Sequence, residues 1–285
     1  MVSTSNIIAL IVSGLGCFLI PIVAFILVRK KSKNITGALI AGIVSFVVMQ
    51  MIIRINLLQF VLPKMNWYIK MAQTNIPMYA LFLGFTAGLF ETVGRYLTLK
   101  LFVREKTSYY SGLSHGIGHG GIEAILLVGI NTLVYAFYAS LINQGKFDAV
   151  INASAVGSTA ETVRIQMETL QQLLINGTAG QTLLGLLERF LVFFVHVGLS
   201  VMVAEGIVKG KGLLYSLYAI LIHGALDTMA VLMVYAKWNA LAIEGVVALF
   251  AVGMIVYIVT SKKRFERFFK VYPVEKEQPM LESDY

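Results

Sequence analysis

The chain has 285 residues, of which 58% are hydrophobic and 13% are charged. Soluble domains carry about 25% charged residues, so this composition excludes an ordinary soluble protein and indicates a membrane protein. The net charge of +8 lies in short basic clusters between apolar segments, which argues against nucleic acid as a partner, and the single cysteine, Cys17, excludes an intrachain disulfide framework.

Seven apolar segments follow one another along the chain, each near or above the roughly 20 residues that a membrane-spanning helix needs. They predict an all-α, polytopic membrane protein. No basic residue precedes the first segment, so we expect it to be kept as a span and not cleaved as a signal peptide. The segments cover residues 6–28, 36–62, 76–103, 109–142, 180–208, 212–235 and 241–260.

The basic residues predict the orientation. Fifteen of the 23 Lys and Arg residues fall on one side of the predicted spans, five fall on the other, and Arg54, Arg95 and Arg189 lie within spans. Because cytoplasmic loops are enriched in Lys and Arg, we expect the N-terminus outside and the C-terminus in the cytoplasm. Arg54 is near the outer end of its span, so we expect its side chain to snorkel toward the interface.

The one long connection covers residues 143–178. Its start, INASAVGSTA, is typical of a flexible segment, and Val163, Met167 and Leu174 then recur at helical spacing among polar residues. We expect an amphipathic helix on the outer surface; a packing cap over the spans and a gate for substrate are the alternatives. Residues 1–272 are expected to form one transmembrane domain with its polar site in 76–235, and residues 273–285 a disordered cytoplasmic tail.

Ionisable side chains occur at one depth in four predicted spans. Counted from the cytoplasmic edge of each span, they lie 10 to 12 residues in, which is roughly 15–18 Å and close to the middle of a hydrocarbon core about 30 Å thick. Charged groups are costly at that depth and indicate function or pairing. These residues are Glu91, His119, His196 and His223.

Helical spacing adds a second polar residue to each of these spans. Residues four or seven apart lie on nearly the same helix face, so each span is expected to turn a polar stripe toward a common cavity. The glycine-rich run around His119 favours close helix approach there, which simple helix packing would explain equally well. The pairs are Glu91 with Arg95, His119 with Glu123, Arg189 with His196, and His223 with Asp227.

This combination suits the activation of water. Arg95 is one turn from Glu91 and would keep that carboxylate ionised as a general base. The histidines could orient the water, stabilise an oxyanion or hold a divalent metal such as zinc, for which His119, His196 and His223 are the candidate ligands. No HExxH motif is present, so the residues alone leave metal binding open.

These motifs, in this order, resemble the CAAX-protease and bacteriocin-processing superfamily of intramembrane peptidases and its PrsW-type relatives. The closest resemblance is to the YhfC-type group of bacterial intramembrane metalloproteases. FETVGRY resembles the first motif through Glu91 and Arg95, GIGHGGIEA offers His119 and Glu123 for the second, ERFLVFFVH matches the third through Arg189 and His196, and HGALD matches the last through His223 and Asp227. Thr92 stands where the family often has a second Glu, and His115 replaces an expected Phe, so His119 and Glu123 both stay candidates for the second motif's role.

The resemblance implies an intramembrane protease of the plasma membrane of a bacterium, acting on a peptide in or next to the bilayer. Glu91 would activate water, His119 and His196 would position it or bind metal, and His223, oriented by Asp227, would stabilise the oxyanion. Arg95 and Arg189 would tune Glu91 and Glu123. Two other classes remain compatible with a polar midplane: a proton- or ion-coupled transporter, and a non-catalytic membrane protein of peptidase ancestry.

Overall fold

A computed structural model describes residues 1–272, which are mainly helical and contain no β-strand within that range. Seven helical segments are long and apolar enough to cross a membrane, which confirms the predicted all-α, seven-span architecture. The predicted disordered tail, 273–285, lies outside the described residues. The spans are Thr4–Arg29, Thr36–Lys64, Ile76–Val103, Tyr109–Asn143, Ala179–Val208, Gly212–Tyr235 and Ala240–Val271.

Four spans are continuous α-helices and three change their winding part-way. The continuous helices are α1 (Thr4–Arg29), α9 (Ala179–Val208), α10 (Gly212–Tyr235) and α11 (Ala240–Val271). The second span runs through α2 (Thr36–Phe46), the π-helical η1 (Val47–Arg54) and η2 (Leu57–Val61), and the 3₁₀ turn η3 (Leu62–Lys64). The third joins α4 (Ile76–Thr98) to the π-helical η4 (Leu99–Val103), and the fourth joins α5 (Tyr109–Glu123) and α6 (Ile130–Asn143) through the π-helical η6 (Ala124–Gly129).

Local capping explains where the central spans begin and end. Ser108 and Ser111 form a reciprocal capping box at the start of α5, and Thr178 and Gln181 do the same for α9. Gly210 follows α9 with a φ of 67°, a left-handed conformation that glycine adopts without a steric penalty. The two helices that carry His119 and His196 therefore have starts encoded in the adjacent sequence.

The last span is longer than the predicted 241–260, because α11 continues to Val271. Its added turns are held against α9. Arg264 donates from Nε to the buried carboxylate of Glu205 on α9 at 2.7 Å, and the Phe265 side chain is buried. These contacts stabilise the helical turns beyond residue 260, so α11 continues past the end of the apolar segment.

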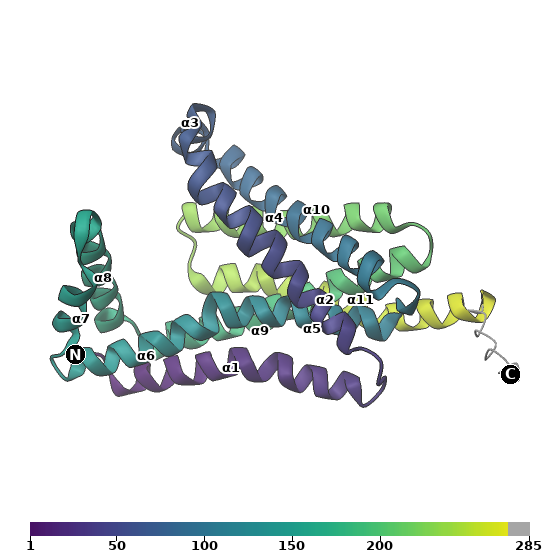
Figure 1. The fold of residues 1–285 in the computed structure, drawn as a ribbon, viewed down its shortest axis with the longest axis horizontal. Coiled ribbons are helices and arrows are strands. Elements are labelled where there is room, and N and C mark those ends of the chain that lie inside the picture. Colours follow the sequence, from purple (N-terminus) through teal and green to yellow (C-terminus); the bar gives the residue numbers. More distant parts are fainter. Residues whose placement is uncertain (273–285) are drawn as a thin grey trace, which may run out of the picture.

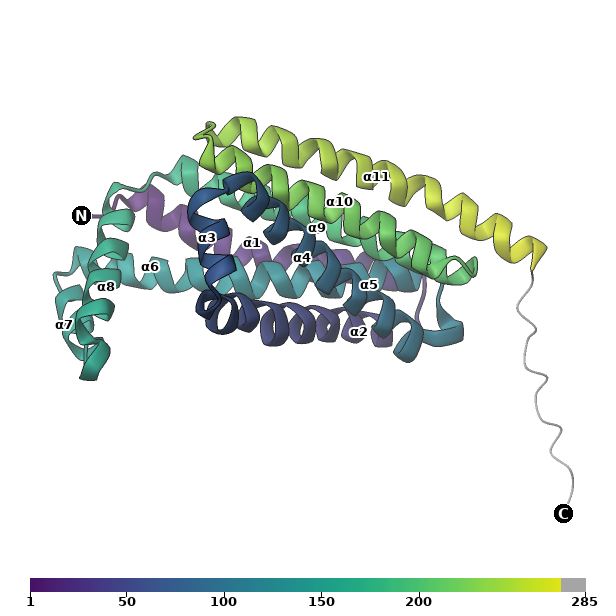
Figure 2. The ribbon, with the colours of Figure 1, turned by 90° about the horizontal axis from the view of Figure 1, so that it is seen from above.

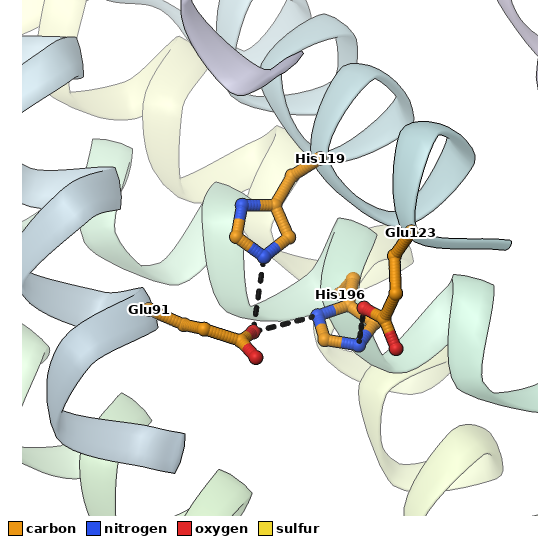
Figure 3. A group of neighbouring side chains, drawn as sticks. All are labelled: Glu91, His119, Glu123 and His196. Atoms are coloured by element: carbon orange, nitrogen blue, oxygen red, sulfur yellow. Dashed lines mark hydrogen bonds and ion pairs between the residues drawn. The ribbon is translucent and has the colours of Figure 1, made fainter. Parts of the chain in front are cut away.

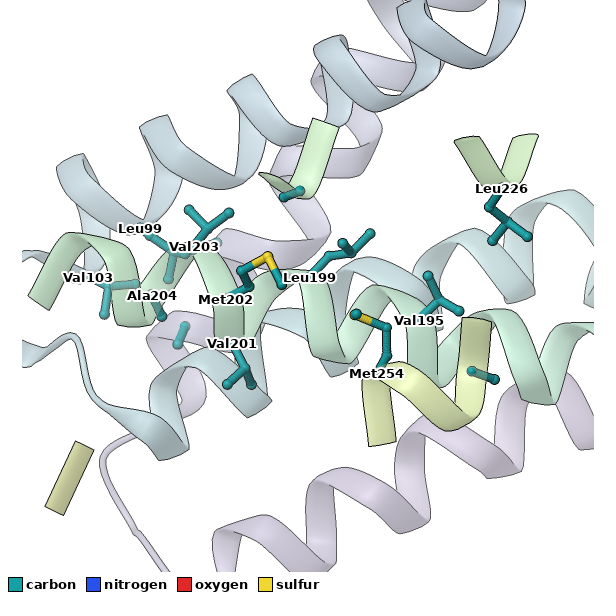
Figure 4. Close-up of a cluster of buried hydrophobic side chains, with 14 of the residues drawn as sticks. Leu99, Val103, Val195, Leu199, Val201, Met202, Val203, Ala204, Leu226 and Met254 are labelled. Atoms are coloured by element: carbon teal, nitrogen blue, oxygen red, sulfur yellow. The ribbon is translucent and has the colours of Figure 1, made fainter. Parts of the chain in front are cut away.

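The helix α9 is the centre of the bundle. In its most apolar 18-residue window 72% of the residues are buried, whereas no other span exceeds 33%. Leu199, Val201 and Val203 contribute fully buried side chains to the main hydrophobic cluster, where Leu226 of α10 and Met254 of α11 meet them (Figure 4). Residues on α9 are thus surrounded by protein on nearly every side.

The bundle has two distinct ends. Figure 1 shows the N-terminus together with α7 (Phe147–Ser154) and α8 (Ala160–Asn176) at one end, which we call the N-terminal end, and the end of α11 at the other, which we call the C-terminal end. The helix α3 (Asn66–Thr74), which the sequence did not predict, lies between the second and third spans and packs against α4. The predicted periodicity of Val163 to Leu174 falls within α8. Seen from above, α11 and α2 form opposite edges of the bundle, with α4 and α9 between them (Figure 2).

Candidate functional site

Close contact between helix backbones brings the polar stripes together. On α5, a Cβ added to Gly118 would lie 2.1 Å from the carbonyl oxygen of Leu39, and one added to Gly116 would lie 2.5 Å from the Cα of Val197. Any side chain at these positions would push α5 away from α2 or α9. The glycines of the run around His119 therefore serve helix packing, and this packing carries His119 into the interior.

The pair α4 and α10 is joined in the same way. A Cβ on Gly88 would lie 2.6 Å from the carbonyl oxygen of Ile220, and one on Gly84 would lie 2.4 Å from that of Gly224. This contact places Gly224 level with the stretch of α4 just before Glu91. His223, next to Gly224, is thereby held beside Glu91.

Glu91 is the centre of the site. Its Oε2 atom lies 3.0 Å from Nε2 of His119, 3.2 Å from Nη2 of Arg95, 3.6 Å from Nδ1 of His223 and 3.7 Å from Nδ1 of His196. All five side chains are buried, and Glu91 is 3% exposed. The three histidines that share the predicted depth of Glu91 thus converge on one of its carboxylate oxygens. Figure 3 shows two of them, His119 and His196, together with Glu91 and Glu123.

A second carboxylate joins this group through His196. Arg95 donates from Nη2 to Nδ1 of His196 at 2.6 Å, so the imidazole proton is assigned to Nε2, which lies 2.7 Å from Oε2 of Glu123. Oε1 of Glu123 lies 3.3 Å from Nη1 of Arg189, and the same arginine pairs with Glu188. The two arginines therefore each hold one of the two site carboxylates, and Glu188 belongs to the second pair.

His223 and Asp227 form the side of the site that leads toward the N-terminal end. Nε2 of His223 lies 3.5 Å from Oδ2 of Asp227, one helical turn away, and its Nδ1 has no hydrogen-bond partner among the described residues. The Asp227 side chain is 36% exposed, much more than any other member of the site except Glu188. Its position beside the imidazole agrees with an orienting role, which stays a prediction.

His115 lies next to the site but is not available to it. Its ring stacks on His119 with centroids 6.4 Å apart. Thr98 already donates its hydroxyl proton to a helix carbonyl, so it accepts from Nε2 of His115 at 2.9 Å, and Nδ1 then accepts from Ser200 at 3.2 Å. Both ring nitrogens are occupied, which makes His115 a packing and positioning residue for His119.

The donor set suits a divalent metal. Glu91, His119, Glu123 and His196 each offer one ligand atom, and these four atoms lie within 4.8 Å of one another. Imidazole nitrogens and carboxylate oxygens are ligands that zinc accepts in catalytic sites. Nδ1 of His223 is buried without a hydrogen-bond partner among the described residues, which is the state of an atom that a cation would satisfy. The residues therefore fit a metal; of the three histidines predicted as ligands, His223 is outside this foursome but faces the same oxygen of Glu91.

Sequence reasoning missed two residues near the site, Phe46 and Gln50, and misplaced the side chain of Arg54. The edge of the Phe46 ring packs on His119, with centroids 5.4 Å apart. Arg54 does not snorkel as expected: it is 8% exposed and turned inward, where Nη1 donates to Gln50 at 3.3 Å. The expectation was wrong because the side chain also donates to Leu83 and Thr86 of α4, and the sequence alone does not reveal these contacts. The spacing of Gln50 and Arg54, four residues apart in an apolar span, was the signal that could have found them.

Two comparisons with known proteins bear on this site. A family model described as YhfC intramembrane metalloprotease matches residues 16–251, a range that includes every residue named above as a site member. The uncharacterized membrane protein YhfC of Bacillus subtilis (strain 168) is 30% identical over 269 residues, which cover 93% of this chain and 100% of that protein. No solved structure matches the chain.

Proposed function

The chain belongs to the YhfC intramembrane metalloprotease family, and on that premise we propose that it hydrolyses a peptide bond within or next to the membrane. The observation that carries the proposal is the convergence of three imidazoles and one guanidinium on Glu91 in a buried layer between four spans. A base held in place by rigid helices in a low-dielectric interior is the arrangement that water activation requires.

Glu91 is the general base in this proposal. Arg95, at 3.2 Å, stabilises its ionised form, and His119 donates to the same oxygen. Glu91 takes a proton from water, the resulting hydroxide attacks the carbonyl carbon of the scissile bond, and Glu91 then delivers that proton to the departing amine.

The imidazoles assist in different ways. Both nitrogens of His196 are occupied, Nδ1 by Arg95 and Nε2 by Glu123, so His196 positions the attacking water through Glu123, the carboxylate that it holds beside Glu91. His223 stabilises the oxyanion when both of its nitrogens carry protons, since Nδ1 then donates to the oxyanion and Nε2 faces Asp227. A divalent metal, held by His119, His196 and Glu123 with Glu91 or His223 beside them, would supply Lewis-acid polarisation of the carbonyl or the water.

We further propose the predicted orientation. The protein is a multi-pass membrane protein, and the bacterial relative supports placement in a bacterial plasma membrane. The excess of Lys and Arg on one side of the spans supports a cytoplasmic C-terminal end. The substrate is then a membrane-embedded or membrane-adjacent peptide that reaches the midplane, where Glu91 lies.

The test is cleavage of synthetic peptides, each with one apolar segment of about 20 residues, co-reconstituted with the purified full-length protein in lipid vesicles. Wild type is expected to release fragments that mass spectrometry assigns to one bond. Glu91→Gln and His223→Ala are expected to lower the rate by about 100-fold or more, the range for loss of a general base or an oxyanion donor.

Glu266→Gln is the matched control, because it makes the same chemical change on an exposed glutamate of α11. It is expected to cleave at the wild-type rate. Unchanged cleavage in both Glu91→Gln and His223→Ala would overturn the proposed assignment of the site.

A further inference from the structure

Arg54 is a buried cation without a carboxylate partner. Its Nη2 donates to the carbonyl oxygen of Leu83 at 2.8 Å, Nε to Thr86 at 3.2 Å and Nη1 to Gln50 at 3.3 Å, and among the described residues no carboxylate lies within ion-pair distance. A guanidinium in hydrocarbon costs several kcal/mol unless it is hydrated or paired. Neutral acceptors alone leave part of its hydrogen-bonding capacity unused, since guanidinium has five N–H donors.

These contacts continue the site along α4. Tyr79, Leu83 and Thr86 recur at helical spacing on one face of α4, and Glu91 follows five residues after Thr86. At about 1.5 Å per residue, these positions are spaced by roughly 5–8 Å along the helix axis, and Glu91 lies about 140° around the helix from Thr86. Hydrogen-bonded waters bridge gaps of this order. Polar groups thus run from the site toward the N-terminal end without a long apolar gap.

The outer end of this row is a pair of tyrosines. The hydroxyl of Tyr68 on α3 lies 3.3 Å from that of Tyr79 on α4, and Tyr68 is 7% exposed. Burial raises the pKa of Tyr68 to about 12, so its hydroxyl keeps its proton and can donate at neutral pH. The neighbouring Trp67 is 52% exposed, which brings the row to the surface of the protein.

Asp227 is partly exposed on this side of the site. Its side chain is 36% exposed although it lies one turn from His223. The next residue, Thr228, is so close to Gly84 that a Cβ there would meet its Oγ1 at 2.3 Å, which places Asp227 level with the Arg54 contacts on α4. A carboxylate exposed at this depth faces either lipid, at a cost of several kcal/mol, or water.

We propose that Tyr68, Tyr79, Arg54, Gln50 and Asp227 line a polar route, between η1, α3, α4 and α10, by which water reaches Glu91 from the N-terminal end of the bundle. The inference rests on the proposed function, because hydrolysis consumes one water per bond and Glu91 itself is only 3% exposed. Arg54 is a positioning residue in this route. Its hydrogen bonds hold η1 of the second span against α4 of the third, and its charge keeps water between these two spans.

The route is tested by the reaction of single cysteines with a charged, membrane-impermeant maleimide, which needs the thiolate and therefore water. The full-length chain carries Cys17→Ser, and Gln50→Cys or Asp227→Cys is added. The control is Ile52→Cys, on the same π-helical segment but 59% exposed away from the bundle interior. Both route cysteines are expected to react at least about tenfold faster than Ile52→Cys, because a thiol in contact with water forms the reactive thiolate far more readily than a thiol in lipid.

Two exposed lysines mark the sides of the membrane: Lys146→Cys at the N-terminal end and Lys263→Cys at the C-terminal end. Route cysteines are expected to react only with reagent on the side that labels Lys146→Cys. Adding Arg54→Met should slow the labelling of Asp227→Cys severalfold, and Arg54→Lys should preserve it.

The proposal is overturned if the route cysteines react no faster than Ile52→Cys, if they react only from the Lys263 side, or if Arg54→Met leaves the labelling rate of Asp227→Cys unchanged. Labelling requires no cleavage, so the outcomes are separable. Labelling without any peptide cleavage refutes the proposed function and keeps the route, whereas cleavage without labelling does the reverse.

Discussion

Glu205 is a buried carboxylate outside the proposed site, and its replacement gives the sharpest test of which ionic groups are structural. It lies near the C-terminal end of α9 and is 1% exposed. Arg264 donates to it at 2.7 and 3.0 Å, Tyr257 at 2.7 Å and Lys209 at 2.5 Å. Two helices, α9 and α11, are joined through this one side chain.

The variant Glu205→Gln keeps the size of the side chain and removes its charge. Removing one partner of a buried ion pair costs about 3–5 kcal/mol, but the side chains of Arg264 and Lys209 are 36% and 24% exposed, so water screens part of the interaction. We therefore expect a loss of about 2–4 kcal/mol, since each charge-assisted hydrogen bond contributes about 1.5–3 kcal/mol. For a chain of this size that corresponds to a fall in Tm of about 4–8 °C.

The assay is thermal unfolding of the purified protein in detergent, followed by intrinsic fluorescence. Glu266→Gln, which changes an exposed glutamate whose Oε1 is 3.9 Å from Lys262, is expected to show no resolvable change. Peptide cleavage per folded molecule should be unaffected by Glu205→Gln, because Glu205 is more than two turns from His196 along α9. A Tm for Glu205→Gln equal to that of Glu266→Gln would refute the stability argument.

Three further outcomes follow from the contacts. Gly118→Ala should destabilise by about 1–3 kcal/mol, because its Cβ would lie 2.1 Å from a backbone oxygen of α2, whereas Gly253→Ala, with nothing within 4 Å, should be neutral or slightly stabilising in the same unfolding assay. Metal content, measured by mass spectrometry of the purified protein, should fall in His119→Ala and be retained in His115→Ala; equal loss in both would contradict the ligand assignment. Burial lowers the pKa of Lys209, but its hydrogen bond to the carboxylate of Glu205 raises that pKa above the usual value. The free energy of unfolding lost in Lys209→Met should therefore be constant from pH 7 to about 10. It should shrink at higher pH, where the wild-type lysine loses its charge.

Much of the site could be predicted from the sequence, because the position of a residue along a membrane-spanning helix gives its depth in the bilayer. An α-helix rises by a uniform amount per residue, so counting from the basic loops was enough to place Glu91, His119, His196 and His223 at one level. The structure brings these four side chains together around one oxygen atom. Their catalytic roles, and the orientation of the termini, stay predictions that the experiments above address.

The hydrogen-bond partners of each polar side chain could not be predicted from the sequence. His115 has the same residue type as His119 and lies one turn nearer the cytoplasmic edge of the span, but only the structure reveals that Thr98 and Ser200 occupy both of its ring nitrogens. The Arg54 side chain was expected to reach the membrane interface, but it turns toward the bundle interior and donates to the carbonyl oxygen of Leu83. Which face of a helix meets which neighbour depends on rotation and tilt, and these are set by contacts between residues far apart in the chain.

The sequence by itself determined the number of spans, their apolar character and the single polar layer, because each of these follows from the cost of placing polar groups in hydrocarbon, one residue at a time. The tertiary structure decided which polar groups surround Glu91 and which are closed off, and it added α3 and the long end of α11. Those features depend on the close approach of backbones at residues such as Gly88 and Gly118, which no count along a single helix contains.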